Sequence, residues 1–399
     1  MIEVLDSTLR EGEQTPGVYF DPHIKLAIAR MLDKVGVQYV EAGHPAVSSD
    51  IRAAVRQLAA SGLNAVVGAH SRSLKKDVDA ALDCGAHFLG IFYCVSDERL
   101  NGVFRTDLRS AIEQIAQVIS YAKQQDPGLI VRYTPEDTVR SQFQNVVDAA
   151  AAAVESGADI ISVADTTGYM VPGTDHNMYD YVARLKAELE YRGLRPKIAV
   201  HCHNDRGLAL ANALDAYRAG AEIIDAAVLG LGERAGIVDL AQLLVVLHAD
   251  FDENRWNLEE LMNVYQLVSE HAGVPFPVNF PVTGPNAFTH CAGVHTHAAT
   301  INPTHYESLN PDLLGRPRRF SLDHMSGMAS VRFALRQIAE PEELAPTVLE
   351  AIKAVGRKGK VVDFPELRHI VEAAKHNGAG MALDGGKRLL RGVEDGERR

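Results

Sequence analysis

The feature that most constrains this chain is the regular alternation of short apolar segments with longer amphipathic ones, which continues to about residue 250. The apolar segments are rich in β-branched residues and are hardly interrupted by polar ones, which is typical of parallel strands that are buried on both faces. They lie near residues 2–6, 37–43, 64–70, 88–93, 129–134, 160–165, 197–203 and 223–230.

The segments between these strands have helical periodicity, for example at residues 22–36, 110–125 and 141–157. Several of them end in glycine, which commonly terminates a helix. Eight strands that each precede a helix predict an α/β fold, a (β/α)8 TIM barrel. An open, doubly wound sheet is the alternative, but it more often carries a glycine-rich fingerprint after its first strand, and DSTLREGEQ has none.

The pattern changes beyond the barrel and predicts three regions. Residues 1–273 are expected to form the barrel. Residues 274–330 begin with the proline-rich VPFPVNFPVTGP, which cannot form a regular helix or a central strand, so we expect an irregular lid or linker with short helices. Residues 331–399 are expected to form a small helical region that ends in a polar tail.

Charge and composition exclude several classes of function. The formal net charge of -12 argues against a nucleic-acid partner, because phosphate neutralisation needs a basic surface. No apolar run approaches the roughly 20 residues that a membrane-spanning helix needs, so no membrane partner is expected. The four cysteines are scattered, and the first residues lack a secretory apolar region. A cytoplasmic location is therefore expected.

The segment His201-Cys202-His203 is the sharpest local signal for chemistry. Residues two apart in a strand point to the same face, so both imidazoles are available to one divalent metal. Glu11, after the first strand, would add a carboxylate at the same rim of a closed barrel. This set suits Zn, Mn, Fe, Co or Mg. The alternative is a pair of ordinary polar histidines.

Two further charged residues at strand ends allow more than one interpretation. Arg10 beside a metal would stabilise an enolate or a developing alkoxide, although alone it is more often part of a surface ion pair. Glu136 is a candidate general acid or base. Its alternative role is that of a helix N-terminal charge, with Glu136 and Asp137 opening the helix that follows the fifth strand.

Two more motifs remain open on the sequence alone. The turn GLGERAG lacks the spacing of a P-loop, and it is either a phosphate-binding turn or a tight turn without a ligand. His295 and His297, in CAGVHTHA, are either a second metal pair or include one acid–base residue that acts over the barrel mouth. We favour the acid–base interpretation for this segment.

Several long motifs together resemble a known family. LDSTLREGEQTPG, VRYTPEDTVRS, VADTTGYMVP, VHCHNDRGLALANALDAYRAGA, LGLGERAG and THCAGVHTHA look like the homocitrate synthase and 2-isopropylmalate synthase family of metal-dependent barrel acyltransferases. The resemblance covers about residues 1–330. It implies a Claisen condensation of acetyl-CoA, the co-substrate, with a 2-oxo acid, followed by thioester hydrolysis. It also implies a metal held by Glu11, His201 and His203.

The resemblance implies roles for the residues that bind the 2-oxo acid. Arg10 would steady the enolate or the carbonyl oxygen. Arg132, Thr134 and Thr166 would hold the carboxylate, and His70 would face the distal part of the substrate.

The resemblance also implies the groups that act on acetyl-CoA. His295 would deprotonate its methyl group across a homodimer, with Glu136 as partner in the proton transfer and Tyr306 as a further catalytic residue. The residues expected to bind this co-substrate lie in the GLGERAG turn, namely Gly230, Gly232, Glu233 and Arg234.

The chain mixes features of both branches of the family. Glu11 after Arg10 and Ile237 after the turn resemble homocitrate synthases. His44 in EAGHPAVSSD and Tyr306 resemble the isopropylmalate branch, and Thr300 stands where lysine-pathway homocitrate synthases have Tyr.

We expect a homocitrate synthase-like acyltransferase with 2-oxoglutarate as acceptor, because His44 and His70 favour an acidic or polar substrate side chain. The same condensation with 2-oxoisovalerate, pyruvate, phenylpyruvate or a phosphonopyruvate-type acid is the alternative. A barrel lyase and a non-catalytic binding protein are less favoured, since the candidate catalytic residues are present.

Overall fold

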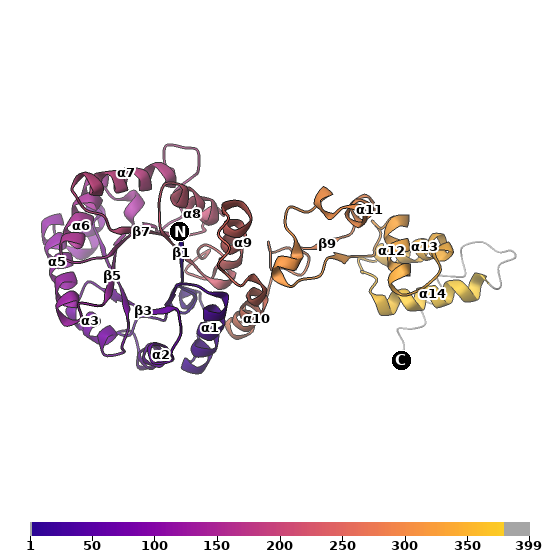
Figure 1. Ribbon diagram of the computed structural model, residues 1–399, viewed down its shortest axis with the longest axis horizontal. Helices are drawn as coiled ribbons and strands as arrows, with labels where there is room; N and C mark the ends of the chain where they lie inside the picture. Colours follow the sequence, from indigo (N-terminus) through magenta and orange to yellow (C-terminus); the bar gives the residue numbers. More distant parts are fainter. Residues whose placement is uncertain (1, 379–399) are drawn as a thin grey trace. The chain divides into compact units, whose positions relative to one another are not determined.

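The computed structural model describes residues 2–378 and divides the chain into two compact units (Figure 1). The first unit runs to Phe276 and includes Pro281–Thr283. The second unit comprises Pro277–Phe280 and the chain from Gly284 on.

The first unit is a closed barrel of eight parallel strands, which confirms the predicted fold. Each strand pairs with the next along the chain, and β1 pairs with β8 to close the ring. The strands are β1 (Glu3–Asp6), β2 (Tyr39–Glu41), β3 (Val66–Arg72), β4 (Phe88–Cys94), β5 (Ile130–Glu136), β6 (Ile160–Asp165), β7 (Lys197–Cys202) and β8 (Ile223–Ala226).

One layer of apolar side chains fills the barrel below its polar rim. Apolar side chains from six strands form this layer, because every second residue of a barrel strand points inward. Its members are Leu5, Tyr39, Phe88, Ile160, Ala199 and Ile223. Tyr39, Phe88, Ile160 and Ile223 are the first residues of their strands, so the layer closes the interior and leaves the carboxyl ends free to carry polar groups.

Helices surround the barrel, and their boundaries follow local sequence signals. Asp21 caps α1 by accepting from the backbone N–H groups of His23 and Ile24, and the helix ends at Gly36 in the left-handed conformation, φ 93°. The helices of this unit are α1 (Pro22–Val35), α2 (Ser49–Ala59), α3 (Lys75–Leu82), α4 (Asp97–Arg99), α5 (Leu108–Gln125), α6 (Phe143–Glu155), α7 (Met178–Tyr191), α8 (Ala209–Arg218), α9 (Leu240–Phe251) and α10 (Leu261–Ala272).

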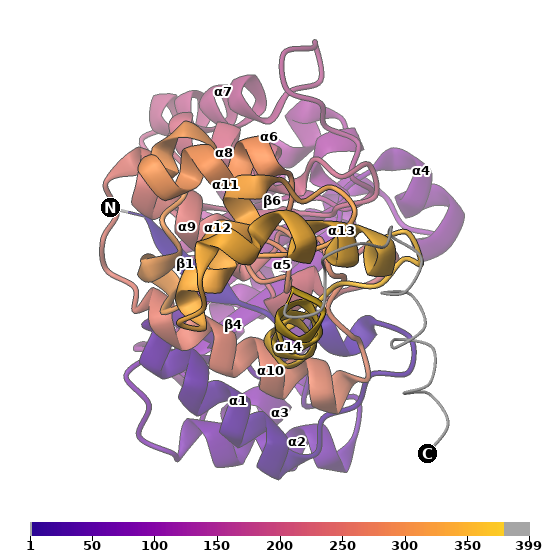
Figure 2. The ribbon, with the colours of Figure 1, turned by 90° about the vertical axis from the view of Figure 1, so that its right-hand side faces the viewer.

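The second unit is small and mainly helical (Figure 2). It has its own apolar core. It contains α11 (Gly293–Ile301), α12 (Met328–Gln337), α13 (Ala345–Gly356) and α14 (Phe364–Gly378). The short strands β9 (Thr289–His290) and β10 (Arg319–Phe320) form a parallel pair that the sequence did not predict, since two residues are too few to show a period.

The predicted division after residue 330 falls inside α12. Val331 and Leu335 of this helix are fully buried in one core with Val348 and Ile352 of α13. The helical region therefore begins earlier than predicted. The predicted polar tail lies outside the described residues.

Within residues 2–378, no helix is both long and apolar enough to cross a membrane. The four cysteines are free thiols.

Candidate active site

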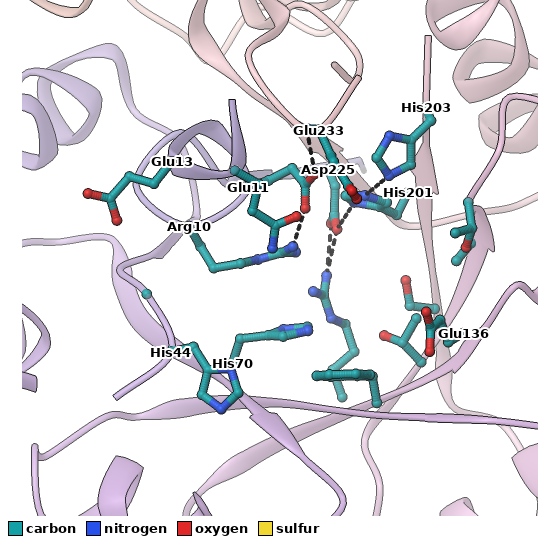
Figure 3. A pocket seen from close by; sticks show the side chains of 18 of the residues that line it. Arg10, Glu11, Glu13, His44, His70, Glu136, His201, His203, Asp225 and Glu233 are labelled. Carbon is teal, nitrogen blue, oxygen red and sulfur yellow. Dashed lines mark hydrogen bonds and ion pairs between the residues drawn. The ribbon is translucent and has the colours of Figure 1, made fainter. Parts of the chain in front are cut away.

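A cavity of about 360 Å³ opens at the carboxyl ends of the barrel strands (Figure 3). The predicted site residues of the first unit that line it are Arg10, Glu11, His44, His70, Arg132, Thr134, Glu136, Thr166, His201, His203 and Glu233. The structure thus brings together residues that are up to 223 positions apart in the sequence, from Arg10 to Glu233.

The predicted metal ligands form a compact buried cluster. Glu11, His201 and His203 each offer a ligand atom, and these atoms lie within 4.8 Å of one another. His201 lies in β7 and His203 follows it, so that their Nε2 atoms are 3.3 Å apart. Glu11 comes from the turn after β1, which is brought close to β7 by the closure of the barrel through β8.

The chemistry of these three groups fits a divalent cation. Asp225 Oδ2 lies 3.0 Å from His201 Nδ1, so this nitrogen carries the proton and Nε2 has a free lone pair. Burial and the neighbouring His201 lower the pKa of His203 to about 3, which keeps its ring neutral. Burial alone would raise the pKa of Glu11, but Arg10 and the two histidines lower it below its usual range. One carboxylate and two imidazoles with open positions suit several divalent metals.

Glu41, the last residue of β2, connects much of the remaining site and was missed by the sequence analysis. Its fully buried carboxylate accepts hydrogen bonds from Ser7 (2.7 Å), Arg10 Nε (2.6 Å) and Arg132 Nη2 (3.3 Å). It also lies 3.0 Å from His70 Nδ1. Burial would raise the pKa of Glu41, but Arg10 and His70 hold it well below the usual range, so the carboxylate is charged.

Asp225 in β8 is a second buried carboxylate that the sequence analysis missed. Both of its oxygens accept from Arg132 Nη1 at 2.9 Å, and one also bonds His201. Asp225 and Glu41 were detectable as single acidic residues inside apolar strand segments. Arg132, predicted to hold a substrate carboxylate, is 1% exposed, and its terminal nitrogens contact these two protein carboxylates. Its Nε has no hydrogen-bond partner.

Hydroxyl groups on β5 and β6 face the same cavity. Thr134 Oγ1 and Ser162 Oγ are buried and have no hydrogen-bond partner. Thr166 Oγ1 accepts from the backbone N–H of Asp137 at 3.0 Å. Ser162 was missed, although it is the polar residue inside the apolar segment IISVAD. Unpartnered hydroxyls in a buried wall are available to the oxygens of a small acid.

Glu136 ends β5 and points to the cavity mouth, where it forms an ion pair of 2.6 Å with Arg99. The alternative that Glu136 and Asp137 open the next helix is wrong. Asp137 has a left-handed backbone conformation, φ 59°, and α6 begins only at Phe143.

The GLGERAG turn positions Glu11. The backbone N–H of Glu233 donates to Glu11 Oε1 (3.2 Å), that of Gly232 donates to Thr15 Oγ1 (3.0 Å), and that of Gly230 donates to Ala227 O (3.0 Å). These three N–H groups are therefore not free for a phosphate.

The side chains of this turn have different positions. The Arg234 side chain bonds Asp205 at 2.8 Å and the backbone oxygen of Thr166 at 2.6 Å. Glu233 lines the cavity, whereas Gly230, Gly232 and Arg234 do not.

The predicted acid–base residues of the second unit lie on or near α11. The His295 ring stacks on the Tyr306 ring with centroids 4.1 Å apart. His297 follows two positions later on the same helix, and residues two apart on a helix do not face each other. A metal pair of His295 and His297 is therefore not supported by the structure.

Comparisons with known proteins agree with this architecture. Residues 1–268 match the HMGL-like family model, and residues 282–360 match the model described as homocitrate synthase post-HMGL domain-like. A homocitrate synthase of Pyrococcus horikoshii is 42% identical over 88% of this chain and 94% of its own length. One from Pyrococcus abyssi is 45% identical over 84% of this chain and 90% of its own length.

Solved structures with lower identity share the fold. The HMG-CoA lyase of Bacillus subtilis superposes with a TM-score of 0.58 at 22% identity, over 69% of this chain and 95% of the lyase. The carboxyl transferase domain of Rhizobium etli pyruvate carboxylase has a TM-score of 0.54 at 16% identity, over 68% of this chain and 47% of that chain.

Proposed function

This chain belongs to the homocitrate synthase family, and from that premise we propose that it condenses acetyl-CoA with 2-oxoglutarate and hydrolyses the resulting thioester. As a family member it is an acyltransferase that joins acetyl-CoA to a 2-oxo acid. The match of residues 282–360 to the post-HMGL domain supports a synthase rather than a lyase.

The buried cluster of Glu11, His201 and His203 beside an open cavity is the observation that carries the proposal. A divalent metal held by these residues would polarise the ketone of the acceptor and fix its orientation. Zn, Mn, Mg, Fe and Co all suit one carboxylate with two imidazoles.

Arg10 is proposed to stabilise the charge that develops on the reacting oxygens. Its Nε donates to Glu41 at 2.6 Å and its Nη1 donates to Glu11, so the guanidinium is fixed beside the metal ligands. Burial would lower the pKa of Arg10, but Glu41 and Glu11 raise it, so the group stays charged. Because this cation is already in position, no free energy is needed to reorient it when the enolate or alkoxide forms.

The hydroxyls of Thr134, Thr166 and Ser162 are proposed to hold the C1 carboxylate of the 2-oxo acid. All three line the cavity, and two of them have no partner within the protein. Arg132 supports this wall through Nε, while Asp225 and Glu41 hold its remaining nitrogens.

We propose His295 as the base that removes a proton from the acetyl methyl group, acting in a homodimer with Tyr306 and Glu136. The stack of His295 on Tyr306 supports a fixed orientation of the imidazole. The carbanion then attacks the ketone carbon, a carbon–carbon bond forms, and the ketone oxygen takes a proton. Water cleaves the thioester and releases the CoA thiol.

The same proposal assigns the regions. Residues 1–273 supply the catalytic barrel, residues 274–327 the lid with the base, and residues 328–378 the helical region. Acetyl-CoA is proposed to approach the rim near Glu233, which lines the cavity, with Gly230, Gly232 and Arg234 shaping that rim.

A thiol-release assay tests the proposal. Purified protein, acetyl-CoA and a divalent metal are combined with 2-oxoglutarate, 2-oxoisovalerate, pyruvate, phenylpyruvate or phosphonopyruvate. We expect the highest kcat/KM with 2-oxoglutarate, a product of homocitrate mass, and loss of activity with chelator. Absence of thiol release with every acid would refute the condensation, and preference for another acid would refute the acceptor.

A further inference from the structure

We propose that Lys25 is a positioning residue for the condensation, because its ammonium fixes Arg10 against Glu41 in the wall of the cavity. Lys25 itself does not line the cavity. It acts on the reaction through the two backbone segments that carry these charged side chains. This inference rests on the proposed function and deepens it, because it names the group that holds Arg10 where negative charge develops.

Lys25 occupies a position where the periodicity of α1 predicts an apolar residue. One side of this helix is buried and carries Ile28, Ala29, Leu32 and Val35 besides Lys25. Lys25 begins this buried stripe and is 1% exposed. Removing an ammonium from water costs much free energy, so a lysine at such a position needs acceptors inside the protein.

Three acceptors meet the Lys25 ammonium. Its Nζ donates to the backbone oxygens of Leu9 (2.7 Å) and Ala42 (2.9 Å). It also forms an ion pair of 2.6 Å with the carboxylate of Glu13. An ammonium has three N–H groups and a neutral amine has two, so three acceptors require the charged form. Every N–H of the group is thus used, and the buried charge has an opposite partner.

The two backbone oxygens belong to residues that flank an ion pair of the site. Leu9 precedes Arg10, and Ala42 follows Glu41. Arg10 Nε donates to Glu41 at 2.6 Å. Lys25 therefore joins the turn after β1 to the end of β2, one residue away from the contact between the two side chains. Loss of this link would allow the two segments to move relative to one another.

Arg10 depends on a fixed orientation for its proposed role. Its guanidinium donates to Glu41 and to Glu11. A cation that is already in place stabilises an enolate or alkoxide better than a mobile one, and a displacement of about 1 Å can lower a rate about 100-fold. A substitution that lets the Arg10 segment shift should therefore lower kcat more than it raises KM for the 2-oxo acid.

The experiment compares Lys25→Met, Arg10→Ala, the double variant and Ile28→Ala with the wild type in the thiol-release assay. Methionine keeps the unbranched stem of lysine but has no N–H group to donate. Ile28→Ala is the matched control, because Ile28 is fully buried on the same side of α1 and its truncation loosens helix packing without removing a donor. Circular dichroism and elemental analysis establish that each variant is folded and loaded with metal.

We expect Lys25→Met to lower kcat about 10- to 100-fold, with a smaller change in KM for the preferred 2-oxo acid. In the Arg10→Ala background the same substitution should change kcat less than about twofold, because a residue that acts through Arg10 has no effect once Arg10 is removed. Ile28→Ala should lower the unfolding temperature but keep kcat near the wild-type value. A crystal structure of Lys25→Met should show Arg10 Nε displaced from Glu41.

Equal losses from Lys25→Met in the wild type and in the Arg10→Ala background would overturn the inference. A wild-type kcat in folded Lys25→Met, or the same loss of kcat in Ile28→Ala, would overturn it as well. If Arg10→Ala has no measurable turnover, the crystal structure of Lys25→Met decides, and an unmoved Arg10 overturns the inference.

If Lys25→Met does not fold, Glu13→Gln/Lys25→Met replaces it, with Glu13→Gln as its reference, because the second substitution removes the unpaired carboxylate. Failure of both to fold would assign Lys25 a purely structural role and overturn the inference. A wild type that releases no thiol with any acid would instead refute the proposed function, whereas the crystal structure tests the position of Arg10 without turnover.

Discussion

At the scale of the residue, the site is organised by two carboxylates that contact other protein groups. Asp225 joins His201 to Arg132, and Glu41 joins Arg132 to Arg10. Each buried charge has an opposite partner, which offsets the free-energy cost of removing it from water. The orientations of His201, Arg132 and Arg10 are therefore coupled through these two acids.

Asp225→Asn should weaken metal binding about 10- to 100-fold, because the amide does not fix the tautomer of His201 as a carboxylate does. Competition with a fluorescent chelator measures the affinity. Asp148→Asn, at a partly exposed ion pair with Arg192 on the outer helices, is the control and should bind metal as the wild type does. Unchanged affinity in folded Asp225→Asn would show that Asp225 does not support the metal ligand.

His201→Ala should lower metal content and thiol release together, since it removes one of the three ligand atoms. Elemental analysis of the purified variant and the thiol assay check this expectation. A variant that retains a full equivalent of metal would count against His201 as a ligand.

His295→Ala should abolish turnover while metal content and 2-oxo acid binding stay unchanged, because this residue belongs to the second unit and not to the metal cluster. Calorimetric titration with the 2-oxo acid separates binding from turnover. Normal turnover would place the base elsewhere, with His297 as the next residue to test.

At the scale of the element, the apolar segments and glycine stops were enough to predict the eight strands and the barrel helices. The pair His201 and His203 was predictable because the strand period is local. The pairing of Glu41 and Asp225 with Arg132 was not predictable, since it joins residues 91 and 93 positions apart and forms only when the barrel closes.

A buried acid, Asp239, caps the N-terminus of helix α9. Asp239 Oδ1 accepts from the backbone N–H of Gln242 (2.9 Å), and Oδ2 accepts from Tyr265 Oη (2.8 Å). Burial raises the pKa of Asp239 to about 7, although these hydrogen bonds oppose the shift. The folded protein therefore keeps a proton that the unfolded chain releases near pH 4.

The contribution of the raised Asp239 pKa to the free energy of unfolding is fully present below about pH 4. It is lost as the pH rises to about 7. Asp239→Asn resembles the protonated acid at every pH. The free energy of unfolding of the wild type, relative to this variant, should therefore fall by a few kcal/mol between about pH 4 and pH 8. Urea denaturation at several pH values measures it. A constant difference would contradict a raised pKa.

At the scale of the whole molecule, the barrel and the second unit have separate apolar cores. The proposed metal ligands all belong to the barrel. A ligand that binds only the folded state stabilises the unit that holds it.

Removal of the metal should therefore lower the unfolding temperature of the barrel and leave that of the second unit unchanged. At a free metal concentration of about 1,000 times Kd, binding would add about 4 kcal/mol to the free energy of unfolding of the barrel. Differential scanning calorimetry with and without chelator measures both transitions. Equal shifts of both would contradict an assignment of the metal to the barrel alone.

The pairing of β1 with β8 has a consequence for how the protein matures. Glu11 is made early during synthesis, whereas its two histidine partners and the strand that seals the ring are made some 190 to 215 residues later. A ribosome-bound chain that ends before Ile223 contains all three proposed ligands but lacks β8, the strand that lies between β7 and β1 in the closed barrel. We therefore expect the ion to bind only after the whole barrel has been translated, so that ion content would report completed ring closure.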